Sequence, residues 1–111
     1  MNTDNILSVL DGFTLESVED IAIKLAEDFR RRRVEKNLTR EELAQMAEIP
    51  VSNLVRFEQK GLISLKNLIA LSMALGYTSE VRNIFASPKY ATMEELTQIR
   101  KNTNRKKAYK K

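Results

Sequence analysis

The stretch of residues 38–76 reads LTREELAQMAEIPVSNLVRFEQKGLISLKNLIALSMALG and contains the clearest structural pattern of the chain. Its apolar residues recur at helical spacing in three short runs, which are separated by breaks at residues 48–50 and 60–61. Proline at position 50 is tolerated at a helix start, and glycine at position 61 suits the left-handed position just after a helix end. The stretch therefore predicts three short helices joined by two tight connections.

Polar residues mark where these helices begin. Thr39 is followed three residues later by Glu42, which is the spacing of a capping box, and Ser64 stands before the third apolar run. Ser17 and Asp20 repeat the capping pattern ahead of another helical segment. Two helices joined by a turn of three to four residues form a DNA-binding unit in which the second helix enters the major groove.

An apolar face precedes this unit and ends in a cation. Six residues follow the helical rule on that face: Val18, Ile21, Ala22, Leu25, Ala26 and Phe29. Arg33 comes next on the same face, and a buried charge needs a partner because an unpaired one is very costly. Glu58, at the inner end of the second short helix, offers that partner. Arg30, Arg31 and Arg32 are expected to form a solvated patch.

The remaining elements are also helical. Leu65, Leu68, Leu71 and Leu75 are predicted to be core. Ser79 is expected to cap a fifth helix that carries Val81, Ile84 and Phe85, and Thr92 a short helix over residues 93–100. A lead helix with Ile6, Leu7 and Leu10 is also expected. The predicted organisation is an all-α chain with an N-terminal lead segment (1–16), a five-helix domain (17–86), and a short helix with a basic tail (87–111).

Composition excludes several classes of function. The 111 residues include no Cys and no His, so thiolate metal sites and the commonest general base are absent. Three scattered Gly residues form no phosphate-binding loop, and no apolar run approaches the roughly 20 residues that span a bilayer. We expect a protein of the cytoplasm that is not an enzyme, binds no metal or cofactor, and has no membrane partner.

The net charge of +4 is unevenly distributed. Residues 100–111 hold seven of the 19 Lys and Arg residues and no acid, whereas residues 1–20 hold five acids and no base. Residues 29–61 are mildly basic. A basic tail can grip phosphates without reading sequence, and a solubilising end is the alternative interpretation.

Residues 29–76 resemble the lambda-repressor-like (Cro/CI, or XRE) helix-turn-helix family. The motifs that carry the resemblance are L-T-x-E-E-L-A (38–44), R-F-E (56–58) and S-L-x-x-L-x-x-L-x-x-A-L-G (64–76). The resemblance implies a five-helix transcriptional regulator, usually a dimer, which binds a palindromic operator and often represses its own gene. It also implies that Arg33 and Glu58 form the family's buried ion pair. The family's turn glycine is Glu48 in this sequence.

The resemblance also implies contacts with double-stranded DNA. It places Val51, Ser52 and Arg56 where the recognition helix meets base edges. Residues at phosphate-contact positions are Thr39, Arg40, Asn53, Gln59 and Lys60.

A second resemblance points to another class of function. The segment GFTLESVEDIAIKLAEDFRRRR, the block FEQKGLISLKNL and the basic tail look like small regulators paired with HipA-type kinase toxins. The alternative interpretation is therefore an antitoxin or protein-interaction module that binds and neutralises such a toxin. The two functions are compatible in one molecule.

Overall fold

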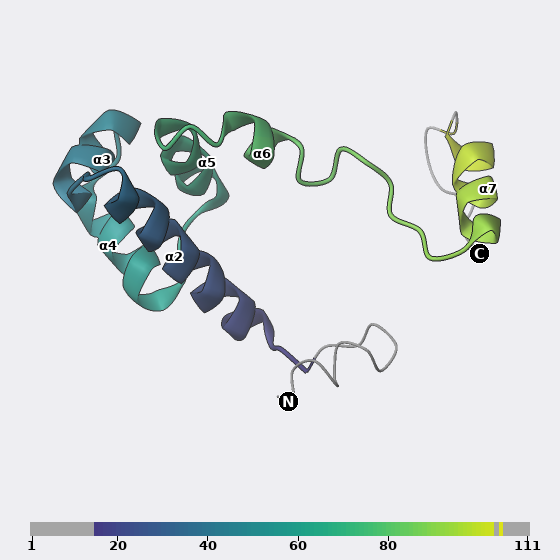
Figure 1. Ribbon diagram of the computed structural model, residues 1–111, viewed down its shortest axis with the longest axis horizontal. Helices are drawn as coiled ribbons and strands as arrows, with labels where there is room; N and C mark the ends of the chain where they lie inside the picture. The colour runs from purple at the N-terminus through teal and green to yellow at the C-terminus, as the bar shows by residue number, and fades with distance from the viewer. Residues whose placement is uncertain (1–14, 104, 106–111) are drawn as a thin grey trace. The chain divides into compact units, whose positions relative to one another are not determined.

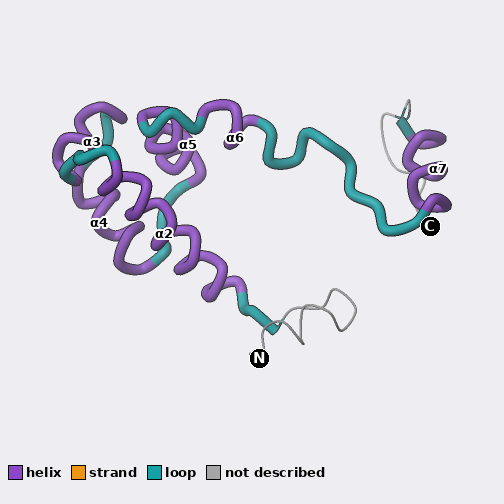
Figure 2. The backbone as a smooth tube through the Cα atoms, in the orientation of Figure 1, coloured by secondary structure: helices purple, strands orange, loops and turns teal. Residues whose placement is uncertain are grey.

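A computed structural model describes residues 15–103 and 105. Within this part of the chain every regular element is a helix, and no strand occurs (Figures 1 and 2). Five helices lie between Ser17 and Phe85, which confirms the all-α prediction: α2 (Val18–Glu35), α3 (Arg40–Ala47), α4 (Val51–Lys60), α5 (Leu65–Ala74) and α6 (Thr78–Arg82). The predicted lead helix lies outside the described residues.

The predicted caps begin the helices. The Ser17 hydroxyl accepts a hydrogen bond from the Asp20 N–H, and the Asp20 carboxylate accepts one from the Ser17 N–H. Thr39 and Glu42 form the same reciprocal box at the start of α3. These pairs satisfy N–H groups that the first turn of a helix leaves unpaired, so they fix where α2 and α3 begin.

The turns that join α3, α4 and α5 depend on two left-handed residues. Glu48 ends α3 with a φ of 59°, and Pro50 precedes α4 in an extended conformation. Gly61 ends α4 with a φ of 69°, and a Cβ there would lie 3.0 Å from the backbone of Ala22. Gly61 is therefore required both for the left-handed turn and for the close approach of this turn to α2.

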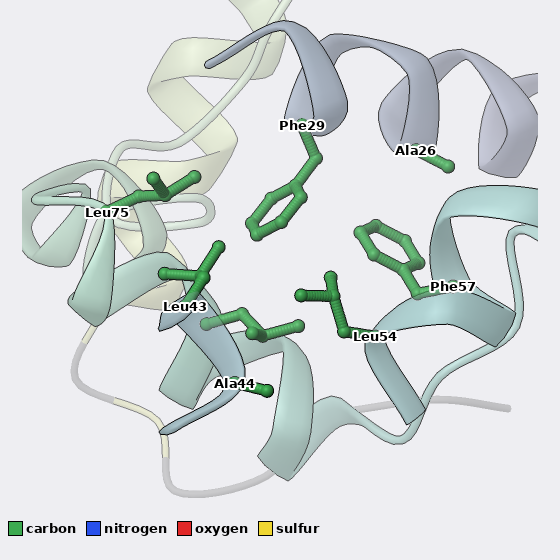
Figure 3. Close-up of a cluster of buried hydrophobic side chains, with 8 residues drawn as sticks. Ala26, Phe29, Leu43, Ala44, Leu54, Phe57 and Leu75 are labelled. Carbon is green, nitrogen blue, oxygen red and sulfur yellow. The ribbon is translucent and has the colours of Figure 1, made fainter. Parts of the chain in front are cut away.

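The core lies where α2, α3, α4 and α5 meet (Figure 3). Helix α2 packs on α4, and α3 packs on both α4 and α5. The rings of Phe29 and Phe57 meet edge to face at 5.4 Å, a favoured aromatic geometry. The buried apolar side chains are Ala26, Phe29, Leu43, Ala44, Leu54, Phe57, Leu71 and Leu75.

Part of the predicted apolar surface is exposed. Leu65 was expected in the core but is 70% exposed, because α5 is apolar on two faces and its neighbours cover the one with Leu71 and Leu75. The predicted apolar face of α2 is likewise covered only toward its C-terminal end. The turn at Gly61 meets α2 at Ala22, and Val18, one turn earlier, is exposed.

The chain divides into two compact units, Met1–Thr78 and Ser79–Lys111. Helix α6 begins at Thr78 and ends at Arg82, so the prediction of a cap at Ser79 was wrong: Ser79 is the second residue of the helix, two positions after Tyr77, which precedes it. Ile84 and Phe85 lie outside α6, contrary to the prediction, and Phe85 is 93% exposed. In the second unit, α7 (Met93–Asn102) begins after Thr92, whose hydroxyl accepts from the Glu95 N–H, which confirms that predicted helix.

Candidate nucleic-acid interface

Helix α4 has one buried face and one polar exposed face. Leu54 and Phe57 are buried against the core, which fixes the rotation of the helix. Ser52 and Arg56 lie four residues apart and are both exposed, so they share a face on the side away from the core. A rigid helix with one presented polar face is the arrangement that a recognition helix requires.

The three predicted base-contact residues lie within the first two turns of α4. Val51 and Ser52 occupy its first turn and are exposed, and Arg56 follows one turn later. Among the described residues, Arg56 forms no ion pair. Its guanidinium is therefore available for the acceptor pair of a guanine.

The five predicted phosphate-contact residues differ in their surroundings. Gln59 and Lys60 are exposed at the C-terminal end of α4, and Asn53 is half-buried. The Thr39 hydroxyl already accepts from the Glu42 N–H, which leaves its own O–H to donate. The Arg40 side chain forms an ion pair with Glu58 and does not extend freely into solvent.

Glu58, on α4, is the acid that binds Arg40 and links α4 to α2 and α3. Its two carboxylate oxygens accept from Nε and Nη2 of Arg33, at 2.7 and 2.9 Å, and the two side chains are 0% and 9% exposed. Arg33 Nη1 also donates to the carbonyl oxygen of Leu38, 2.8 Å away, so the same group holds the segment before α3. The structure therefore brings together the two residues that the sequence pairs.

The pKa values of this pair shift in the directions that hydrogen bonding favours. Burial raises the pKa of Glu58, but hydrogen bonds from Arg33 and Arg40 outweigh it and hold the pKa below its ordinary value. The hydrogen bond to Glu58 raises the pKa of Arg33 against the opposing effect of burial. Both groups therefore remain charged at neutral pH.

The contact of Arg40 with Glu58 was not predicted. Arg40 Nε donates to Oε1 of Glu58 at 2.9 Å, and the Arg40 side chain is 32% exposed. These residues are 18 positions apart, and no local spacing rule connects them. Arg40, which the sequence predicts to contact a phosphate, thus forms an ion-pair cluster with Glu58 and Arg33.

A hollow beside α4 adds residues that the sequence did not indicate. It has a volume of about 210 Å³ and lies between α4 and the start of α5, where Ser64 caps the helix through the N–H of Asn67. The cap at Ser64 was predictable, but its position beside Arg56 depends on the tertiary fold. The hollow is lined by Asn53, Arg56, Leu62, Ile63, Ser64 and Asn67.

Comparison with known families agrees with this geometry. A family model described as Helix-turn-helix (HTH_3), the XRE or lambda-repressor-like class, matches residues 29–82. These residues form a helix-turn-helix domain of that family, whose members are DNA-binding regulators and not typically enzymes. No curated protein sequence matches the chain.

Neither a metal site nor a membrane-spanning helix occurs in the described part of the chain. No group of three or more acidic residues there is placed to hold a metal ion. None of its helices combines the length and the apolar character needed to cross a membrane.

Proposed function

We propose that this protein is a sequence-specific regulator of transcription, which inserts α4 into the major groove of duplex DNA. The observation that carries the proposal is the two-faced character of α4. Leu54 and Phe57 anchor it in the core, while Ser52 and Arg56 are presented without an acidic partner among the described residues. Such a regulator works in the compartment that holds its DNA, which we take to be the cytoplasm.

The exposed side chains suit a division between base reading and backbone positioning. Arg56 has the geometry to bind guanine O6 and N7 in a bidentate contact, Val51 can contact a thymine methyl group, and Ser52 can donate or accept. Gln59 and Lys60 offer donors to phosphates at the far end of α4. The hollow beside Arg56, with Asn53 and Asn67 on its walls, supports a further phosphate contact there.

A homodimer on a palindromic operator would account for a stripe of apolar residues along α5. Leu65, Ile69 and Met73 are spaced by four residues on α5, and Leu65 and Met73 are 70% and 52% exposed. These three residues are called the α5 stripe. A two-fold partner bound through the α5 stripe would present a second recognition helix to the same DNA.

Binding to the DNA upstream of the protein's own gene tests the proposal, since an autorepressor binds there. Fluorescence anisotropy would compare that duplex with a shuffled duplex of the same composition. We expect binding to the upstream duplex to be about a thousandfold tighter or more at physiological salt. Equal binding of both duplexes would leave a DNA-binding protein without sequence specificity, and no binding to either at low salt would refute the proposal.

Exposed apolar groups favour a second candidate function, an antitoxin that holds a HipA-type kinase toxin. Val18, Ile21 and Leu25 are exposed on α2, and Ile84 and Phe85 are exposed after α6. Surfaces of this kind are typical of protein-binding sites. Co-expression with an adjacent gene for a HipA-type kinase tests this function: a stable complex that inhibits kinase activity supports it, and separate elution with full activity contradicts it.

A further inference from the structure

Arg40 and Glu58 form a contact that a simple phosphate-binding role for Arg40 does not require. Arg40 Nε donates to Oε1 of Glu58 at 2.9 Å, and the same oxygen accepts from Arg33 Nη2 at 2.9 Å. Arg33 Nε occupies the other oxygen at 2.7 Å. One carboxylate thus holds two guanidinium groups from two different helices.

The charges of this cluster do not cancel. Two arginines and one glutamate leave a net charge of one positive unit. The Arg33 side chain is 9% exposed and is bonded to Glu58 through two nitrogens, whereas the Arg40 side chain is 32% exposed and is bonded through one. The surplus positive charge therefore lies at the surface, on Arg40.

The bonding pattern also leaves the outer end of Arg40 unused. A guanidinium presents five N–H donors in a rigid planar fork, and the contact with Glu58 uses the one on Nε. The terminal nitrogens Nη1 and Nη2 donate to no acceptor within the described residues. They match the bidentate geometry by which arginine binds phosphate oxygens.

We propose that Glu58 is a positioning residue for DNA binding, which holds Arg40 by Nε so that Nη1 and Nη2 face a DNA phosphate. This inference rests on the proposed DNA-binding function. Fixing a long side chain before binding removes the entropy cost of ordering it in the complex. The bond to Glu58 does not cancel the positive charge of Arg40, because Arg33 already neutralises the Glu58 carboxylate.

Substitution of Arg40 by lysine isolates this role, because the charge is kept and the fork is lost. An ammonium is a compact point charge, and when bonded to Glu58 it ends short of the positions that Nη1 and Nη2 reach. The experiment measures binding of the full-length protein to a 24-base-pair duplex of mixed sequence over a salt series. The proteins compared are wild type, R40A, R40K and R40K/E58Q, with R30K, at an exposed arginine of α2, as the control for a generic lysine replacement.

We expect R40A and R40K to lower the salt slope equally, by about one unit, and to weaken binding at low salt by several-fold. The R40K/E58Q protein should recover the wild-type slope, because the ammonium is no longer held by a carboxylate. Thermal melting checks that each variant is folded. If the double variant is not, the comparison of R40K with R40A still decides, since both keep the ion pair of Arg33 and Glu58.

Other results overturn the inference in distinguishable ways. A wild-type slope for R40K would show that Arg40 acts as a charge that needs no positioning. A wild-type slope for R40A would show that Arg40 contacts no phosphate, while DNA binding itself still stands. Absence of binding by the wild-type protein would refute the proposed function and this inference together.

Discussion

Arg33 and Glu58 join α2 to α4 through two hydrogen bonds of 2.7 and 2.9 Å, with the Glu58 side chain wholly excluded from solvent. Arg33 also bonds the carbonyl oxygen of Leu38, and Arg40 bonds the same carboxylate. The cluster therefore fixes the N-terminal end of α3 against α4. The position of the proposed recognition helix depends on this buried charge pair as well as on the apolar core.

Removal of Arg33 should destabilise the domain strongly. Arg33→Ala leaves Glu58 buried with Arg40 as its remaining cation, and breaking a buried pair costs about 3–5 kcal/mol in the free energy of unfolding. Urea denaturation followed by circular dichroism measures this loss. Arg31→Ala, which removes an exposed arginine of the same helix, should change stability by less than about 1 kcal/mol. A loss below about 1 kcal/mol for Arg33→Ala would contradict the structural role of the pair.

Glu58 should also make stability depend on pH in the acid range. Its pKa in the folded state lies below the ordinary value of 4.5, so the unfolded chain takes up the proton first as the pH falls. Stability should be fully present above about pH 5 and should decrease as the pH falls below 4.5 toward the folded-state pKa. Urea midpoints measured from about pH 6 to about pH 3 test this.

Glu58→Gln is the variant that checks the source of that dependence. It should flatten the acid-range decrease without abolishing it, because the pKa of Asp28 is also lowered, chiefly through its hydrogen bond from Lys24. An unchanged pH profile in Glu58→Gln would show that the decrease comes from other carboxylates.

The features that could be predicted from the sequence are those that depend on local spacing. The capping boxes at Ser17 and Thr39 and the stop at Gly61 follow from helix-end chemistry, and the burial of Ala26 and Phe29 follows from periodicity. The pairing of Arg33 with Glu58 could be predicted because a cation on an apolar face needs an acid, and the second helix offers one.

The features that were missed depend on the tertiary fold. Arg40 reaches Glu58 because Arg33 binds the chain just before α3, which no local pattern encodes. Leu65 was misplaced because α5 is apolar on two faces, and periodicity alone does not show which face its neighbours cover. The hollow beside Arg56 arises where α4 meets the start of α5.

Replacement of Glu48 by glycine should stabilise the protein. Glu48 has a φ of 59°, a left-handed conformation that costs a residue with a side chain roughly 1–2 kcal/mol. Glycine avoids this cost, but it also raises the conformational entropy of the unfolded chain, which offsets part of the gain in stability. We expect a net gain of about 0.5–1 kcal/mol in Glu48→Gly and none in Glu48→Ala, which keeps the strain. Both variants remove an acid close to the proposed DNA contact, so both should bind DNA more tightly at low salt. Equal stabilities of the two variants would contradict the strain argument.

The proposed dimer should depend on the α5 stripe. Leu65→Glu combined with Met73→Glu places two charges where apolar contact is expected, so the protein should sediment as a monomer at micromolar concentration while wild type sediments as a dimer. Val18→Glu, at an exposed apolar residue of α2, is the matched control and should leave the dimer intact. If the dimer persists in the α5 variant but is lost in the α2 variant, the interface lies on α2 and not on α5.

Arg56→Ala tests whether α4 reads DNA bases. Binding is measured over a salt series with the duplex from upstream of the protein's own gene and with a random-sequence pool. Arg56→Ala should weaken binding to the preferred site by about 1–3 kcal/mol and relax the preference at one base position, while binding to the random pool changes little. Equal loss on both DNAs would show that Arg56 contacts the backbone and reads no base. Absence of binding by the wild-type protein to either DNA at low salt would show that α4 has no role in reading DNA.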